Sequence, residues 1–325
     1  RVYWMKIRWA ILGTGTIATE FASHFQADNA ELIAVASRSK EKAQGFAEQY
    51  GIPAYYDDYM ELLADEAVDA IYIALPHSHH HQWIKASLEA GKHVLCEKVI
   101  TVNKIQLDEL VQSAEEKGLY LAEAMTIYHM PLYRKLKEWI AEQDLGPLKM
   151  IQASFGSFKD TDPSVYYFNK ELAGGALFDI GTYALSFVRN FMTSKPTEIM
   201  TMGNLHESGV DESSAIILRN AEAELATVSL TFRAKMPKQG VVAYEKGFLT
   251  IMDYPRSTKA IFTSYDGKVS IIEAGDSAQA LNYEVADFSE RILNGAKNET
   301  LTYTVDVLEI MDKVRKDWGL VYPFE

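Results

Sequence analysis

Buried-strand and helix patterns alternate through the first part of this chain, and this alternation limits the possible folds more than any other feature. Apolar runs typical of buried strands cover residues 7–12, 31–37, 54–56, 67–75, 93–96 and 120–123. Amphipathic helix patterns separate them, at residues 16–26, 40–50, 58–64, 80–90 and 104–117. Such strands bury both faces only in a parallel sheet covered by helices on each side. We predict a Rossmann-type, dinucleotide-binding domain over residues 1–125.

The periodicity changes after Met130 and Pro131, where one helix pattern at residues 132–143 leads into longer strands. Strand composition marks residues 148–158, 197–204, 213–219, 222–233, 240–253, 260–265 and 268–273. Two further helices are expected at residues 279–294 and 305–318. We predict that residues 126–325 form a substrate-binding and dimerisation domain built on a large, mostly antiparallel open sheet. The fold class is therefore α/β plus α+β.

The strand at residues 222–233 has one apolar side and one polar side. Its apolar side carries Ala226, Val228, Leu230 and Phe232, and its polar side carries Thr227, Ser229, Thr231 and Arg233. Helices from the same chain can cover only one face of such a sheet. The other face suits a partner sheet, so we expect a homodimer.

Charge and cysteine content limit the partners. The 325 residues include 32 basic and 45 acidic side chains, a formal charge of −13, which argues against nucleic acid or an anionic membrane as partner. We expect a small-molecule substrate instead. A single cysteine, Cys96, no secretory start and no long apolar run predict a cytoplasmic protein. Residues 1–4, ahead of Met5, are interpreted as a leader outside the fold.

A glycine turn directly follows the first strand. Gly13 permits a tight turn, Gly15 allows close approach of a pyrophosphate, and Ala18 is the small residue where helix meets strand. Amide groups at the start of the next helix could hold phosphates without a lysine. By itself this pattern also occurs in α/β proteins that bind no nucleotide.

The end of the second strand indicates which dinucleotide would bind. Ser37, Arg38 and Ser39 stand there, with no acidic residue to hold a ribose 2′-hydroxyl. Arg38 can pair with a 2′-phosphate and stack on adenine. We therefore predict NADP as the preferred cofactor, with NAD possible.

Three more clusters contain residues that could take part in catalysis or ligand binding. Glu97 and Lys98 follow the fifth strand, at the edge where open α/β sheets bind ligands. A glycine pair, Gly174 and Gly175, precedes a helix on which Asp179 and Tyr183 share one face. The third cluster runs from Leu75 and Pro76 through His77, His79, His80 and His81.

With these motifs the chain resembles the glucose-fructose oxidoreductase and inositol dehydrogenase family, Gfo/Idh/MocA, over essentially its whole length. The family's G-x-G-x-x-A/G turn corresponds to Gly13 through Ala18, and its E-K-P motif to Glu97 and Lys98. Its G-G-x-x-x-D-x-G-x-x-H/Y motif is matched by Gly174, Gly175, Asp179, Gly181 and Tyr183. The tyrosine form is most similar to dimeric dihydrodiol dehydrogenases and NADP-dependent xylose dehydrogenases.

The resemblance implies a hydride transfer between nicotinamide and a carbinol or carbonyl carbon of a sugar, polyol or trans-dihydrodiol. It implies that Tyr183 is the acid/base, that Lys98 lowers the tyrosine's pKa, and that Asp179 positions the substrate hydroxyl. These residues belong to different domains, so they can meet only in a cleft between them. The cofactor-binding residues implied are Gly13, Gly15, Thr16, Ile17, Ser37, Arg38, Leu75, Pro76, His77, His80, Glu97 and Lys98.

The chain departs from the family at several positions. Val99 stands where the family has proline, and arginines frequent near residues 126–129 and 165–168 are replaced. These losses suggest a less acidic, more apolar substrate than a sugar acid or phosphate.

Structural roles are the alternatives at each site. Lys98 can be a solvated strand-end lysine, Tyr183 a packing residue, and Asp179 a helix hydrogen-bonding residue. The histidine run lacks Cys or carboxylate at ligand spacing, so we expect no metal, and Cys96 is interpreted as a small buried residue. A non-catalytic dinucleotide-sensing regulator and an NAD-assisted glycosidase remain alternative functions; the regulator would need neither Lys98 nor Tyr183.

Overall fold

The computed structural model describes residues 5–325, so the leader assigned to residues 1–4 lies outside it. The chain forms two compact units. The first unit runs to residue 101 and adds residues 105–124 and 279–301, and the second holds residues 102–104, 125–278 and 302–325. Within residues 5–325, no helix combines the length and the apolar character that crossing a membrane would need. The assignment of cofactor binding to 1–125 and of substrate binding and dimerisation to 126–325 stays a prediction.

The first unit is built on a parallel sheet, as predicted. Among the described residues this sheet has six strands in the order β3-β2-β1-β4-β5-β6, and every neighbouring pair is parallel. Its strands are β1 (Ile7–Leu12), β2 (Ala30–Ala36), β3 (Ala54–Tyr56), β4 (Ala70–Ile73), β5 (His93–Glu97) and β6 (Leu121–Ala124). The order reverses between β1 and β4, and the crevice beside such a reversal is where doubly wound sheets bind ligands.

Helices link these strands, and two of them end directly before a glycine in the left-handed conformation. The helices are α1 (Thr16–Ser23), α2 (Lys40–Tyr50), α3 (Tyr59–Leu63), α4 (His80–Glu89) and α5 (Lys104–Lys117). Ser39 caps α2 by accepting the Lys42 amide, and Gly51 ends this helix in a left-handed conformation. The predicted bounds of α2 and α5 are confirmed, and Gly118, at φ +63°, follows α5 as Gly51 follows α2.

One more helix belongs to the first unit although it follows the second sheet in the sequence. Helix α8 (Ala280–Asn294) packs Leu281, Val285 and Phe288 into the same core as Trp9 and Phe21. The Trp9 indole donates a hydrogen bond of 3.0 Å to the Ser289 hydroxyl. The last part of the chain thus completes the core that the first strand begins.

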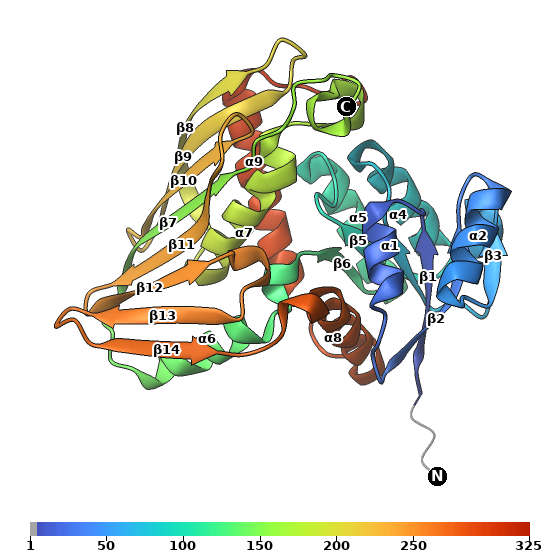
Figure 1. Ribbon diagram of the computed structural model, residues 1–325, viewed down its shortest axis with the longest axis horizontal. Coiled ribbons are helices and arrows are strands. Elements are labelled where there is room, and N and C mark those ends of the chain that lie inside the picture. The colour runs from blue at the N-terminus through green and yellow to red at the C-terminus, as the bar shows by residue number, and fades with distance from the viewer. Residues whose placement is uncertain (1–4) are drawn as a thin grey trace. The chain divides into compact units, whose positions relative to one another are not determined.

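The second unit is built on a mixed sheet that is mostly antiparallel, as predicted. In the described part of the chain it has eight strands in the order β14-β13-β12-β11-β7-β10-β9-β8, and only β7 and β10 pair in parallel. The strands are β7 (Leu148–Gly156), β8 (Pro196–Leu205), β9 (Asp211–Asn220), β10 (Leu225–Thr231), β11 (Met236–Tyr244), β12 (Gly247–Met252), β13 (Lys259–Ser264) and β14 (Val269–Glu273). The accompanying helices are α6 (Pro131–Glu142), α7 (Thr182–Phe191) and α9 (Thr300–Trp318), and α7 and α9 lie against one face of this sheet (Figure 1).

Two local expectations were wrong. The strand expected at residues 240–253 is two strands, β11 and β12, because Glu245 and Lys246 make a two-residue turn between them. The helix expected after the glycine pair begins as a π-helical turn, Leu177–Gly181, and becomes α-helical only from Thr182.

The face of this sheet that the helices leave open is less polar than the sequence of one strand suggests. In β10, Ala226, Val228 and Leu230 are buried, as expected, and Thr227 and Ser229 lie on the opposite face. In the register of the sheet Thr227 pairs with Ile217, and Ile217 pairs with Met200. These apolar neighbours come from other strands, so one strand's pattern could not reveal them.

Candidate functional site

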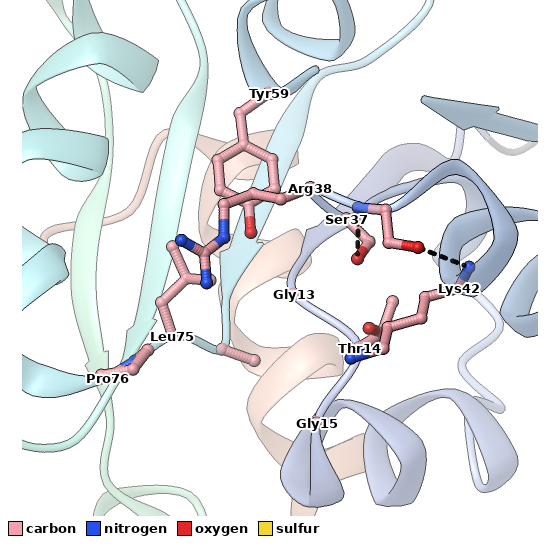
Figure 2. A pocket seen from close by; sticks show the side chains of 11 residues that line it. Gly13, Thr14, Gly15, Ser37, Arg38, Lys42, Tyr59, Leu75 and Pro76 are labelled. Carbon is pink, nitrogen blue, oxygen red and sulfur yellow. Dashed lines mark hydrogen bonds between the residues drawn. The ribbon is translucent and has the colours of Figure 1, made fainter. Parts of the chain in front are cut away.

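A hollow of about 400 Å³ lies at the carboxyl ends of β1, β2 and β4 in the first unit. Loops after these three strands surround it (Figure 2). Its lining residues are Gly13, Thr14, Gly15, Ser37, Arg38, Ser39, Lys42, Tyr59, Ala74, Leu75 and Pro76. Six residues predicted to bind the cofactor are therefore brought together here: Gly13, Gly15, Ser37, Arg38, Leu75 and Pro76.

The two glycines of the turn differ in the space around them. Gly13 has φ +107°, and a Cβ there would lie 2.3 Å from the Ala74 carbonyl oxygen, so a side chain at this position cannot be accommodated. A Cβ on Gly15 would meet nothing within 4 Å. Gly13 is therefore needed for the close approach of β1 and β4, whereas Gly15 keeps the entrance to the hollow free of a side chain.

Helix α1 begins directly at this turn and presents its amide end without a side-chain cap. Gly15 occupies the N-cap, no side-chain cap is found within the described residues, and the first turn contains no acidic residue. Thr16 and Ile17, both predicted to bind the cofactor, are the first residues of this helix. Uncapped amides and the positive end of the helix dipole suit an anionic group, so these residues fit the pyrophosphate of a dinucleotide.

Two cations enter the hollow, one of which the sequence did not identify. Figure 2 shows Arg38 and Lys42 extending into it from two sides. The Ser37 hydroxyl accepts the Ser39 amide at 3.3 Å, which tightens the loop carrying Arg38. Lys42 lies in the first turn of α2, three residues after the Ser39 cap. This spacing is the sequence feature from which its position could have been predicted. No acidic residue lines the hollow among residues 5–325.

The loop after β4 leads into two buried histidines. Leu75 and Pro76 line the hollow, but the His77 and His80 side chains are buried beside it. The Nδ1 atom of His80 lies 2.6 Å from the Val99 carbonyl oxygen and its Nε2 atom 2.8 Å from that of Leu75. Burial lowers the pKa of His80. His80 thus joins the loops after β4 and β5, and its predicted role near the cofactor stays a prediction.

The other histidines of the run have separate neighbours. His81 contacts Glu109, and His79 contacts Ser78. In residues 5–325 no group of three or more His, Cys, Asp or Glu side chains gathers as metal ligands would.

Glu97 and Lys98 stand at the end of β5. The buried Glu97 carboxylate accepts the Tyr72 hydroxyl at 2.5 Å and the Lys98 amide at 3.3 Å. Lys98 is partly exposed, and the peptide bond to the buried Val99 is cis. Burial raises the pKa of the neighbouring Cys96 thiol well above its usual value, in agreement with a packing role.

In the second unit, the predicted pair Asp179 and Tyr183 stands out by exposure. All residues from Ala173 to Asn190 are buried except these two, which are partly exposed. The Tyr183 ring stacks on Phe155 with centroids 6.1 Å apart. Packing therefore orients the ring, and the tyrosine still keeps access to solvent.

A buried carboxylate that sequence reasoning missed supports this segment. Asp211 accepts the Leu177 amide at 2.7 Å, and a Cβ on Gly175, at φ +114°, would lie 2.2 Å from the Asp211 Oδ1 atom. Burial raises the pKa of Asp211 to about 6. Gly175 thus allows Asp211 to reach the start of the helical segment that carries Asp179.

The sequence matches two family profiles. Residues 7–125 match the oxidoreductase family with an NAD-binding Rossmann fold, and residues 133–250 match the Gfo/Idh/MocA C-terminal domain. Trans-1,2-dihydrobenzene-1,2-diol dehydrogenase of Xenopus laevis is 32% identical over 98% of this chain and all of the relative. The mouse (Mus musculus) protein of the same name is 29% identical over 98% of this chain and 99% of the relative.

Solved structures agree on the fold. A 3-ketoreductase of Actinomadura kijaniata, crystallised with NADP and TDP-benzene, aligns with TM-score 0.81 at 24% identity over 95% of this chain and 97% of that one. A levoglucosan dehydrogenase, in complex with NADH and levoglucosan, aligns with TM-score 0.87 at 17% identity over 97% and 98%. At these identities the similarity concerns the fold.

Proposed function

The chain belongs to the Gfo/Idh/MocA family of oxidoreductases, and we propose that it is an NADP-dependent dehydrogenase acting on a trans-dihydrodiol, sugar or polyol. It would transfer a hydride between the nicotinamide and a carbinol or carbonyl carbon. The observation that carries the cofactor choice is the hollow lined by Arg38 and Lys42, in whose lining the described part of the chain places no acidic residue. An NAD site would instead place a carboxylate at the end of the second strand, to bind the ribose hydroxyls.

The proposed cofactor-binding residues lie in the loops of the first unit, and different residues would bind different parts of the cofactor. The uncapped amides of Thr16 and Ile17 would hold the pyrophosphate, with Gly15 leaving room for it. Arg38 and Lys42 would pair with a 2′-phosphate, which an acidic chain with net charge −13 can attract only through a local group of cations. Leu75, Pro76, His77, His80 and Glu97 would shape the loops beside the nicotinamide.

The bound nicotinamide supplies the hydride chemistry, and the protein must move a proton and orient the substrate. We propose that Tyr183 exchanges a proton with the substrate oxygen and that Asp179 positions the substrate hydroxyl. A tyrosine with an ordinary pKa of about 10 is a poor base at neutral pH, so a cation must assist it. Lys98 would be that cation, which requires its amine and the Tyr183 hydroxyl to reach one substrate.

The substrate class is supported by the relatives and by the residues near the proposed site. Relatives similar over the full length are named trans-1,2-dihydrobenzene-1,2-diol dehydrogenases. Tyr166 and Tyr167, both partly exposed, precede the glycine pair in this chain, where other family members often have an arginine; the adjacent Phe168 is buried. Aromatic side chains favour a ring-shaped, uncharged substrate over a sugar acid or phosphate.

Two further proposals concern assembly and compartment. We propose that the open face of the eight-stranded sheet pairs with a second copy, because it exposes apolar side chains from several strands; these include Met200 at 69%, Met202 at 80% and Ile271 at 57%. The single, buried Cys96 supports a reducing compartment such as the cytoplasm.

A substrate panel tests the function. Dihydrodiols, pentoses, hexoses and polyols are assayed with NADP and with NAD while nicotinamide reduction is followed. We expect turnover with NADP on at least one dihydrodiol or sugar. Release of free sugar without net nicotinamide reduction would favour the NAD-assisted glycosidase, and cofactor binding without any turnover would favour the regulator.

A further inference from the structure

The backbone that carries Lys98 is held by three buried ionisable side chains from three elements. Glu97 at the end of β5 accepts the Lys98 amide, His80 of α4 contacts the Val99 carbonyl oxygen, and Glu123 at the end of β6 accepts the Ile100 amide at 2.9 Å. Glu97 and His80 were already predicted near the cofactor, whereas Glu123 has no role in the proposed chemistry.

Glu123 differs from Glu97 in how its oxygens are satisfied. Glu123 is 2% exposed, and in the parallel sheet it pairs with Cys96 of the neighbouring strand β5. One oxygen accepts the Ile100 amide, and the other has no hydrogen-bond partner within residues 5–325. Both oxygens of Glu97 accept hydrogen bonds. A negative charge is therefore better stabilised on Glu97, and a proton on Glu123.

Burial and electrostatics agree with this assignment. Burial raises the pKa of Glu123 to about 7, and the Glu97 charge adds to the rise, while the Ile100 amide and the Lys98 charge oppose it. Burial moves the pKa of three other ionisable neighbours in the direction that favours their neutral forms. It raises the pKa of Tyr72 and of Cys96 and lowers that of His80. Glu284 of α8, also buried, acts electrostatically on Tyr72. The pKa of Glu123 thus lies near neutrality, so its charge changes near pH 7.

We propose that Glu123 is a positioning residue for Lys98: its carboxylate holds the Ile100 amide, fixes the turn that carries Lys98, and acts on the Lys98 ammonium through its charge. This inference rests on the proposed role of Lys98 in catalysis. A charged acceptor binds an amide more strongly than a neutral one, so the turn is held best when Glu123 is ionised. The same charge keeps the Lys98 amine protonated to higher pH.

The pH profile of Glu123→Gln tests the proposal. Glutamine keeps the shape and can accept the Ile100 amide, but it has no charge to gain. In the wild type we expect kcat/KM to rise with pH through a bend near pH 7, which glutamine abolishes. Glu123→Ala, which also removes the acceptor, should lower kcat by roughly ten- to a hundred-fold, because a small misplacement of a catalytic group has effects of that size.

Glu224→Gln is the matched control. Glu224 is also buried and also accepts a backbone amide, that of Thr193, at 2.9 Å, but it belongs to the turn between β9 and β10. Its substitution should leave the bend in place. A wild-type profile without a bend near pH 7, or a bend retained in Glu123→Gln, would overturn the proposal.

Labelling of Lys98 provides a readout without catalysis. An amine-reactive acylating reagent is applied to both proteins over a pH series, and Lys98 modification is quantified by mass spectrometry. At about pH 8, Glu123→Gln should be labelled roughly three- to ten-fold faster, because its lysine loses an anionic neighbour. Equal labelling rates would contradict the inference. A wild type inactive on every substrate would instead reject the proposed function, and the labelling would still test Glu123.

Discussion

Asp179 and Tyr183 remain partly exposed in a stretch of otherwise buried side chains, and a substrate could reach them there for the proposed roles of proton exchange by Tyr183 and positioning by Asp179. The motif spacing predicted a role for both residues, and that role stays a proposal. Their exposure could not be predicted, because it depends on which side of the helical segment faces the sheet. The stacking of Tyr183 on Phe155 orients the ring, and the residue stays partly exposed.

Tyr183→Phe keeps the ring and its stacking on Phe155 but removes the hydroxyl. A positioned acid/base typically contributes 10²- to 10⁴-fold, so turnover should fall by roughly that factor. NADP binding, measured by fluorescence titration, should stay nearly unchanged because Tyr183 is outside the cofactor hollow. If the variant retains near-full activity, the proton moves through another group, and His129 would be examined next.

Lys98→Met tests whether Lys98 and Tyr183 act as a coupled pair. The single variant should lose at least as much turnover as Tyr183→Phe. The double variant should be scarcely worse than the more damaged single one, because each residue is useful only through the other. Losses that add in free energy would show two independent contributions.

Arg38→Ala and Lys42→Ala test the two cations of the hollow. Each should weaken NADP binding by roughly ten- to a hundred-fold, in line with about 1.5–3 kcal/mol for a hydrogen bond to a charged group. NAD, without the 2′-phosphate, should lose less affinity in these variants than NADP does. Isothermal titration with both cofactors measures this difference. Equal losses for NAD and NADP would mean that the residues do not bind a 2′-phosphate.

At the scale of elements, the turn between β1 and α1 contains two glycines with different roles: Gly13 permits close packing, and Gly15 leaves room for the cofactor. Gly13→Ala places a Cβ 2.3 Å from the Ala74 carbonyl oxygen, so it should destabilise the first unit. Gly15→Ala introduces a methyl group into open space, so the protein should fold with its usual melting temperature and bind the cofactor more weakly. Thermal denaturation and NADP titration of both variants separate the effects. Equal melting temperatures for the two variants would contradict this reading.

Helix α8 illustrates an element whose place the sequence did not indicate. Its apolar stripe was evident, but the partner surface lies some 270 residues earlier, around Trp9. Phe288 is buried with its ring centroid 5.4 Å from that of Trp9. Phe288→Ala should therefore cost about 3–5 kcal/mol in the free energy of unfolding, measured by denaturant titration. A loss below about 1 kcal/mol would show that α8 contributes little to this core.

At the scale of the whole molecule, the open face of the eight-stranded sheet determines the proposed assembly. Ile217→Glu places a charge among apolar neighbours on that face, where Met200 and Thr227 flank it in register. Sedimentation at micromolar concentration should show a dimer for the wild type and a 36.6 kDa monomer for this variant. Val321→Glu, at an exposed apolar position outside the sheet, is the control and should remain dimeric. A monomeric wild type would remove the dimer proposal.

The sequence by itself determined the class of the fold, the order of the elements and the residues of the motifs. Alternating buried strands and helices admit essentially one arrangement, and caps such as Ser39 and Gly51 are local signals. Only the tertiary structure decided which distant segments meet. It placed Lys42 in the hollow with Arg38, Asp211 beneath Gly175, Glu123 on the Ile100 amide and α8 on Trp9. The last three contacts join residues that lie far apart in the sequence, where no helix or strand periodicity relates one residue to the other. They could therefore be found only from burial and hydrogen bonding in the folded structure.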